Sequence, residues 1–160
     1  MENTSKEKIK QILYRIEDIE ILDYKSTDPQ SFADRIDAFK NIQVTISTHG
    51  DVNEKNGTIS ALMDVAFSKE YSCVKHEIIN IKTSHIFRIK EFNKVIEKDE
   101  EGRPVLPNWL ILNFLSIAIS GTRGMIAARN VYPEYKKVIL PLMDPTQMLK
   151  GLKKNSEKAD

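Results

Sequence analysis

The sequence is poor in cysteine, glycine and proline, and its charges of opposite sign almost cancel. It has one cysteine, Cys73, among 160 residues, which excludes a disulfide framework and a cysteine-rich metal site. A single free thiol is typical of a reducing compartment, so we expect a cytoplasmic protein. Six glycines and six prolines predict regular secondary structure with few irregular loops.

The charge balance excludes further classes of protein. Lys and Arg total 24 and Asp and Glu total 23, which gives a net charge of +1. Nonspecific nucleic-acid binding needs a basic excess that this chain lacks, and a disordered acidic protein would need the opposite excess. The first ten residues are polar and contain no apolar run, so no secretory signal is expected.

What the chain does have is one long stretch without charge, from Pro104 to Thr122, within an otherwise highly charged sequence. The stretch is long enough to cross a bilayer. However, it opens with two prolines and carries Asn and Ser side chains, which are costly in hydrocarbon. We therefore expect a buried helix and no membrane span.

Alternating apolar and polar residues predict four antiparallel strands. The expected strands cover residues 9–24, 42–47, 59–68 and 73–90, with a turn over 50–57 and a helical turn within 29–40. In the first strand the alternation slips by one residue after Ile16, as a β-bulge would produce. Apolar spacings of three and four from Ile9 to Ile19 leave a helix open there as the alternative.

The second half of the chain predicts helices. A charged connection over 91–106 leads into a long helix over 107–129, then an extended stretch over 138–142 and a last helix opened by Asp144-Pro145-Thr146. We expect an α+β fold, with a four-stranded antiparallel sheet followed by a long helix and a short carboxyl-terminal helix. The single domain would cover 10–152, between flexible ends at 1–9 and 153–160.

The long helix is apolar around most of its circumference, apart from one polar stripe. One sheet covers one side of a helix, so another subunit or a ligand would cover the other side. Small residues near the end of the helix would permit close approach of a partner. The predicted oligomer interface comprises Phe114, Ile117, Ser120, Gly121 and Gly124.

The polar residues offer no arrangement typical of catalysis or of a cofactor site. His76 and His85 lie nine residues apart on one predicted strand, so they point to opposite faces and cannot share a metal. The Gly121–Gly124 segment lacks the Lys of a phosphate-binding loop and predicts close packing, with a local bend at the two glycines. We expect no enzyme activity, no metal and no cofactor.

Apolar residues on the connections exceed what one small sheet can bury. They could line a groove for extended or unfolded peptides, or they could complete the core. The candidate client-binding residues are Phe92, Val95, Ile96, Leu142, Met143, Met148 and Leu149. An acidic cluster on the first strand, Glu17, Asp18 and Glu20, could dock a basic partner.

The order of these elements resembles that of the SecB export-chaperone family, and short motifs support the resemblance over residues 10–152. The first strand carries Arg15-Ile16 and Asp18-Ile19, and the fourth ends in Ile86-Phe87-Arg88-Ile89. Pro107-Asn108 opens the long helix, and Arg123-Gly124 lies near its end. Two further motifs follow, Tyr132-Pro133 and Leu140-Pro141-Leu142, and each is similar to a motif at the same place in the family.

The resemblance implies an ATP-independent holdase that assembles as a dimer of dimers, with the long helices between two sheets. Clients would bind in apolar grooves formed by the crossover connection, the last helix and the sheet, where the seven candidate residues fall. Family members that dock on the SecA motor are strongly acidic. Here the pI is about 7.8 and Leu22 falls near one of the docking carboxylates, which argues against SecA. Relatives that serve an antitoxin offer the alternative partner.

Two other functions remain open from the sequence. A hot-dog-type thioesterase also packs a sheet around an apolar helix. In that fold the helix comes early in the chain and a catalytic Asp, Glu or His lies near its start, whereas here the long helix follows four strands. A noncatalytic scaffold with the same fold and one dedicated partner cannot be separated from a holdase by sequence.

Overall fold

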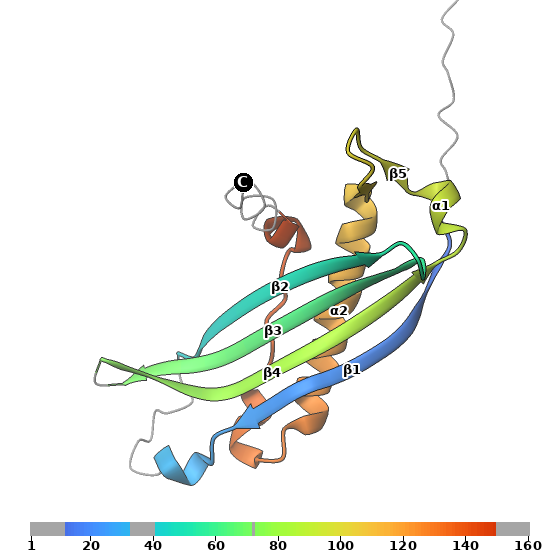
Figure 1. The fold of residues 1–160 in the computed structure, drawn as a ribbon. Coiled ribbons are helices and arrows are strands. Elements are labelled where there is room, and N and C mark those ends of the chain that lie inside the picture. Colours follow the sequence, from blue (N-terminus) through green and yellow to red (C-terminus); the bar gives the residue numbers. More distant parts are fainter. Residues whose placement is uncertain (1–11, 33–40, 72, 150–160) are drawn as a thin grey trace, which may run out of the picture.

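Four long strands form one antiparallel sheet in the order β1-β4-β3-β2 (Figure 1). The computed structural model describes residues 12–32, 41–71 and 73–149, so the segments predicted to be flexible, 1–9 and 153–160, lie outside the described residues. The strands are β1 (Tyr14–Ser26), β2 (Gln43–Asn53), β3 (Thr58–Tyr71) and β4 (Val74–Ile89). This sheet confirms the predicted α+β architecture, with β1 and β2 as its two edges.

Within the described part of the first segment the chain forms a strand, so the helix alternative was wrong there; residues 9–11 lie outside the described residues. The pairing of β1 with β4 shifts between Ile16 and Asp18, which confirms the predicted β-bulge, and shifts again between Ile21 and Asp23. The strand begins at Tyr14, later than predicted, and ends at Ser26. The bulges keep Ile16, Ile19 and Ile21 opposite Phe87, His85 and Thr83, on the helix side of the sheet.

Strand β2 is longer than predicted. Gly50 and Asp51 were expected in a turn, but they pair with Ala61 and Ser60, and the turn begins only after Asn53. Gly57 closes this turn at a φ of 64°, a conformation that glycine adopts without strain. Pairing with β3, whose inward side chains are buried, overrides the weak strand propensity of this part of β2.

The crossover connection is more ordered than its charge indicated. It contains a one-turn helix α1 (Phe92–Val95) and a small hairpin of β5 (Glu97–Lys98) and β6 (Pro104–Val105). Phe92 and Ile96 are both buried in the main core, which agrees with the alternative that apolar residues of the connections complete the core. Phe92 packs against Gly57, where an added Cβ would lie 3.2 Å from the Phe92 Cβ.

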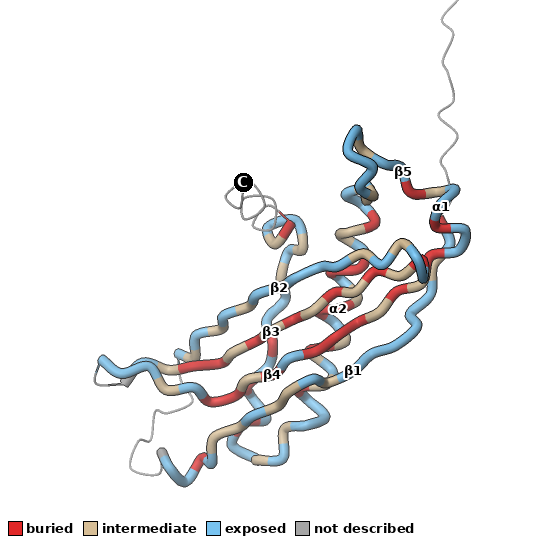
Figure 2. Tube along the Cα trace, in the orientation of Figure 1, coloured by how far each residue is buried: buried red, intermediate tan, exposed pale blue. Residues whose placement is uncertain are grey.

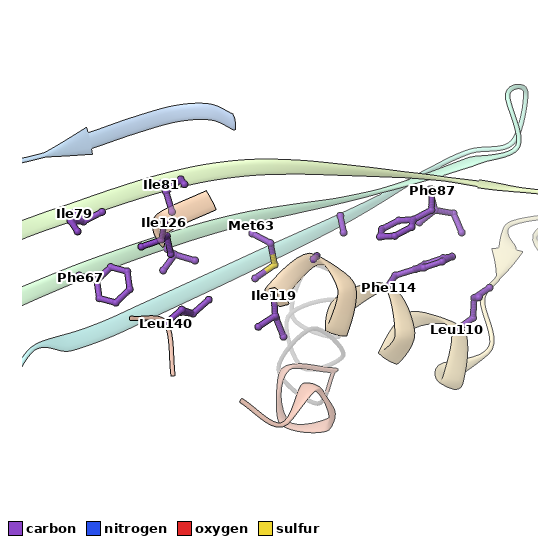
Figure 3. Close-up of a cluster of buried hydrophobic side chains, with 14 of the residues drawn as sticks. Met63, Phe67, Ile79, Ile81, Phe87, Leu110, Phe114, Ile119, Ile126 and Leu140 are labelled. Atoms are coloured by element: carbon purple, nitrogen blue, oxygen red, sulfur yellow. The ribbon is translucent and has the colours of Figure 1, made fainter. Parts of the chain in front are cut away.

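Helix α2 (Asn108–Arg129) crosses one face of the sheet (Figure 1). Its buried residues are Leu110, Phe114, Leu115, Ala118, Ile119, Thr122 and Ile126, and several of them meet Met63, Phe67 and Ile81 in the core (Figure 3). The helix runs through Gly121 and Gly124 as one continuous element. By length and composition α2 could cross a membrane. Of the apolar 18-residue stretch that meets this criterion, 39% is buried within the chain.

The remaining segments cover the same face of the sheet beside α2. Two 3-10 helices, η1 (Pro29–Phe32) and η2 (Pro133–Lys137), flank the long elements. After η2 the chain runs without regular structure, with Val138 and Leu140 buried, and a last helix begins at Pro145. Burial is greatest along β3 and β4 and falls toward β1 and β2 (Figure 2).

Candidate functional site: an apolar cavity at a sheet edge

A cavity of about 530 Å³ lies where β2, β3, the start of α2 and the last helix meet. Its volume is within the usual range of ligand pockets. Most of its wall is apolar, with Thr48, His49, Asp51 and Ser60 as polar members. The apolar lining residues are Val52, Ile59, Ala61, Leu106, Ile111, Phe114, Leu115 and Leu149.

The cavity reaches the edge of the sheet. Five consecutive residues of β2, Thr48–Val52, line it. Within the described part of the chain, β2 pairs only with β3. Its other side therefore presents the backbone donors and acceptors of an edge strand next to an apolar hollow.

Aromatic packing fixes the floor of the cavity. The ring of Phe114 on α2 stacks on Phe87 of β4, with centroids 4.2 Å apart and planes inclined by 15°. Tyr14 of β1 contacts Phe114 edge-on, with ring centroids 5.0 Å apart. These contacts hold the first half of α2 at a defined height above the sheet, so the cavity is a feature of the folded chain and not of a loose helix.

The crossover hairpin forms one side of the cavity through Leu106. Lys98 of the hairpin pairs with Glu54 of the β2–β3 turn, their charged atoms 2.5 Å apart. At the hairpin tip, Arg103 donates from its Nε to Asp99 at 2.8 Å, and hydrogen bonding to Arg103 lowers the pKa of Asp99. The two ion pairs are largely exposed, so they act as positional ties of small energy.

The seven predicted client-binding residues lie in different surroundings. Leu149 lines the cavity. Phe92 and Ile96 are buried, and Val95 and Met148 pack against the core. Met143 is half-buried, whereas Leu142 is 91% exposed.

Sequence reasoning missed most of the cavity wall. Val52, Ile59, Ile111 and Leu115 looked like ordinary core positions of a strand or helix. Their periodicity was visible, but it carries no information about which strand lies at an edge. Only the strand order, with β2 outermost, places these positions in the wall of a cavity at the sheet edge.

The predicted docking carboxylates on β1 are partly engaged. Glu17 accepts two hydrogen bonds from Arg88, from Nε at 2.9 Å and from Nη2 at 2.6 Å. Asp18 accepts the backbone N–H of Ile19 at 2.8 Å, beside the bulge. Glu20 is exposed and pairs across the strands with Ser84. The three carboxylates thus lie at the β1 edge, far in strand order from the cavity at β2.

The predicted interface residues on α2 divide between two sides of the helix. Phe114 and Gly121 lie against the chain's own sheet, so they are not on the free surface of the helix. Ser120 and Gly124 are exposed, and Ile117 is half-buried. The exposed side also carries Trp109 and the polar residues of the predicted stripe.

Comparisons with known proteins give distant matches only. No family model matches the sequence, and no curated protein does. A SecB-like chaperone of Mycobacterium tuberculosis, solved in complex with an antitoxin peptide, is 11% identical with a TM-score of 0.48, covering 81% of this chain and 88% of its own. A protein of unknown function from Streptococcus agalactiae is 14% identical with a TM-score of 0.22, covering 83% and 98%. At these values neither likeness bears on function.

Proposed function

We propose that this protein is an ATP-independent, noncatalytic chaperone that binds extended apolar segments of non-native polypeptides. The observation that carries the proposal is the apolar cavity beside the open edge of β2. An extended peptide would pair its backbone with the β2 edge and insert alternate side chains into the cavity. Backbone pairing does not read sequence, which suits a protein that receives varied clients.

The resemblance of the sequence to the SecB family supports the same mode of action. An antitoxin segment with the same extended, apolar character is the alternative occupant, since the cavity would accept it by the same chemistry. SecA is not proposed as a partner, because two of the three β1 carboxylates already have partners within the chain.

We also propose that the protein works in the cytoplasm as a homo-oligomer, a dimer of dimers with α2 between two sheets. The exposed side of α2 carries Trp109 and the small residues Ser120, Gly124 and Ala127, and it has no charged residue before Arg129, so a second layer could approach it closely. A second layer on this side would cover it.

The direct test of function is suppression of aggregation. A chemically unfolded client is diluted into buffer without nucleotide, and light scattering is followed at increasing ratios of this protein. We expect scattering to disappear near a stoichiometric ratio. No suppression, together with no binding of unfolded client in native mass spectrometry, would contradict the proposal.

Two matched variants assign the activity to the cavity. Ile111→Asp places a carboxylate in the cavity wall and should reduce client binding at least tenfold, because an unpaired charge there opposes apolar contact. Val131→Asp makes the same change at a residue that is 75% exposed and outside the cavity, and it should bind like the wild type. Equal binding by both variants would place the client site elsewhere.

A further inference from the structure

We infer that Arg123 is the positioning residue of the client groove, holding the carboxyl-terminal segment so that Leu149 closes the cavity. The inference rests on the proposed function for its binding consequence, but its structural half can be tested alone. Arg123 does not line the cavity. It would act through the chain segment that leads to the last helix.

The contacts of Arg123 join α2 to that segment. Its Nε donates to the carbonyl oxygen of Leu140 at 2.8 Å, and its Nη2 donates to that of Pro141 at 2.7 Å. One guanidinium thus binds two consecutive carbonyls with its planar fork of donors. A Lys ammonium lacks this geometry, because it is a compact charge on a flexible stem.

The carbonyl of buried Leu140 needs a partner that regular structure does not give it, whereas Pro141 is exposed and its carbonyl adds the second bond. Residues 138–144 belong to no helix and no strand, yet Val138 and Leu140 are buried. A backbone oxygen near a core must be hydrogen-bonded or lose free energy. Arg123 meets this need from a half-buried position on α2, and charge-assisted bonds of this kind are stronger than neutral ones.

The tie lies a short distance along the chain from the cavity wall. The last helix begins at Pro145, and Asp144 accepts the backbone N–H of Thr146 at 2.9 Å to start it. Leu149 then enters the cavity with 8% of its surface exposed. Because only a few residues separate the two ends, the position of Pro141 limits where this helix can lie.

A peptide-binding experiment tests the consequence for the groove. The probe is a fluorescein-labelled, net-neutral peptide of about sixteen residues that alternates Leu or Phe with Ser. Fluorescence anisotropy should show binding weakened about tenfold by Arg123→Gln. Arg123→Lys should weaken binding about threefold.

The matched control is Arg129→Gln, because Arg129 is the other charged residue of α2 and is exposed in its last turn. This variant should bind the probe like the wild type. A loss equal to that of Arg123→Gln would show that charge on the helix is enough, and would overturn the positioning role.

A double-mutant cycle separates positioning from general destabilisation. Leu149→Ala removes the side chain through which Arg123 is argued to act. If the argument holds, Arg123→Gln combined with Leu149→Ala should bind within about twofold of the weaker single variant. Losses that multiply would show independent effects and would overturn the inference.

Hydrogen exchange keeps this outcome distinct from failure of the proposed function. In Arg123→Gln, amide exchange should rise across 138–149 while β3, β4 and the first half of α2 stay protected as in the wild type. Unchanged exchange across 138–149 would overturn the positioning role. If exchange rises there but the wild type binds no probe, the tie stands as described and the chaperone proposal fails.

Discussion

At the scale of single residues, His85 lies fully buried on the helix side of β4. Neither ring nitrogen has a hydrogen-bond partner among the described residues. Its cross-strand neighbours are Ala61 and Ile19, and Gly121 lies directly above its Nε2. These neighbours bring no carboxylate. The nearest charged residue of α2 along the chain, Arg123, has its guanidinium directed to Leu140 and Pro141.

A charged imidazole in this place would have no carboxylate among these neighbours to compensate it. Burial lowers the pKa of His85, and the backbone of Ala61 acts in the opposite direction with the smaller effect. The unfolded chain therefore binds a proton at a higher pH than the folded chain. The stabilising effect of keeping His85 neutral is therefore fully present above the ordinary His pKa near 6.5. The free energy of unfolding falls as the pH drops below this value.

The first prediction concerns how the free energy of unfolding changes with pH. Below pH 6.5, His85 should reduce the free energy of unfolding by up to about 1.4 kcal/mol per pH unit, until the folded-state pKa is reached. Urea unfolding at pH 7.5, 6.0 and 5.0 measures the slope. His85→Leu should flatten it. An equal slope in wild type and His85→Leu would contradict the prediction.

At the scale of elements, two glycines in α2 differ in what surrounds them. A Cβ added to Gly121 would lie 2.6 Å from the Nε2 of His85, closer than real Cβ atoms come to any atom. The imidazole is fully buried and has little room to move away. A Cβ added to Gly124 would meet nothing within 4 Å. Phe114 holds the beginning of α2 on the sheet. The later part of the helix can lie close to the sheet because Gly121 has no side chain.

The second prediction compares alanine at the two positions. Gly121→Ala should lower the free energy of unfolding by about 1–3 kcal/mol, because the methyl group overpacks against His85. Gly124→Ala should raise it by about 0.5–1 kcal/mol, since alanine favours a helix interior and meets no clash. Chemical denaturation measures both variants.

A second background checks the cause. In a His85→Ala protein the methyl group of Gly121→Ala has space, so its cost should largely disappear. A cost that persists without the imidazole would contradict the close approach as its origin.

The Thr83–Thr122 pair ties the same two elements by a different means. Their hydroxyl oxygens lie 2.8 Å apart in the core, joining β4 to α2, and both side chains are completely buried. A buried hydroxyl without a hydrogen-bond partner costs free energy, and here each threonine hydroxyl is the partner of the other. The hydrogen bond and the glycine approach together fix the register of α2 on the sheet.

At the scale of the whole molecule, the described chain has one layer of sheet and one partial layer of helix. The exposed side of α2 is where the proposed assembly would add the next layer. Ser120 lies on this side and is exposed in the single chain. The assembly would bury it, so a charge there would affect association without affecting the folding of one chain.

The third prediction uses that difference. Ser120→Glu should dissociate the oligomer in native mass spectrometry, because a carboxylate at the interface would be desolvated without a partner. Ser47→Glu makes the same change on the exposed part of β2 and should leave the assembly intact. A wild-type monomer would contradict the assembly, and an intact Ser120→Glu oligomer would contradict the role of this helix face.

The sequence by itself determined the types and order of the main elements. Alternation identified the strands, the bulge after Ile16 and the inward row of β4, because side-chain direction repeats locally along a strand. The apolar run identified the buried helix for the same reason. The turn chemistry of Asp144-Pro145-Thr146 correctly placed the start of the last helix.

Only the tertiary structure decided the features on which function is argued. Pairing with β3 extended β2 through Gly50, and packing beside Gly57 drew Phe92 into the core. The strand order placed β2 at an edge beside the cavity. The fit of Gly121 over His85 and the reach of Arg123 to Leu140 join elements far apart in sequence. These contacts depend on which segments become neighbours in space, and the periodicity of one segment carries no record of its neighbours.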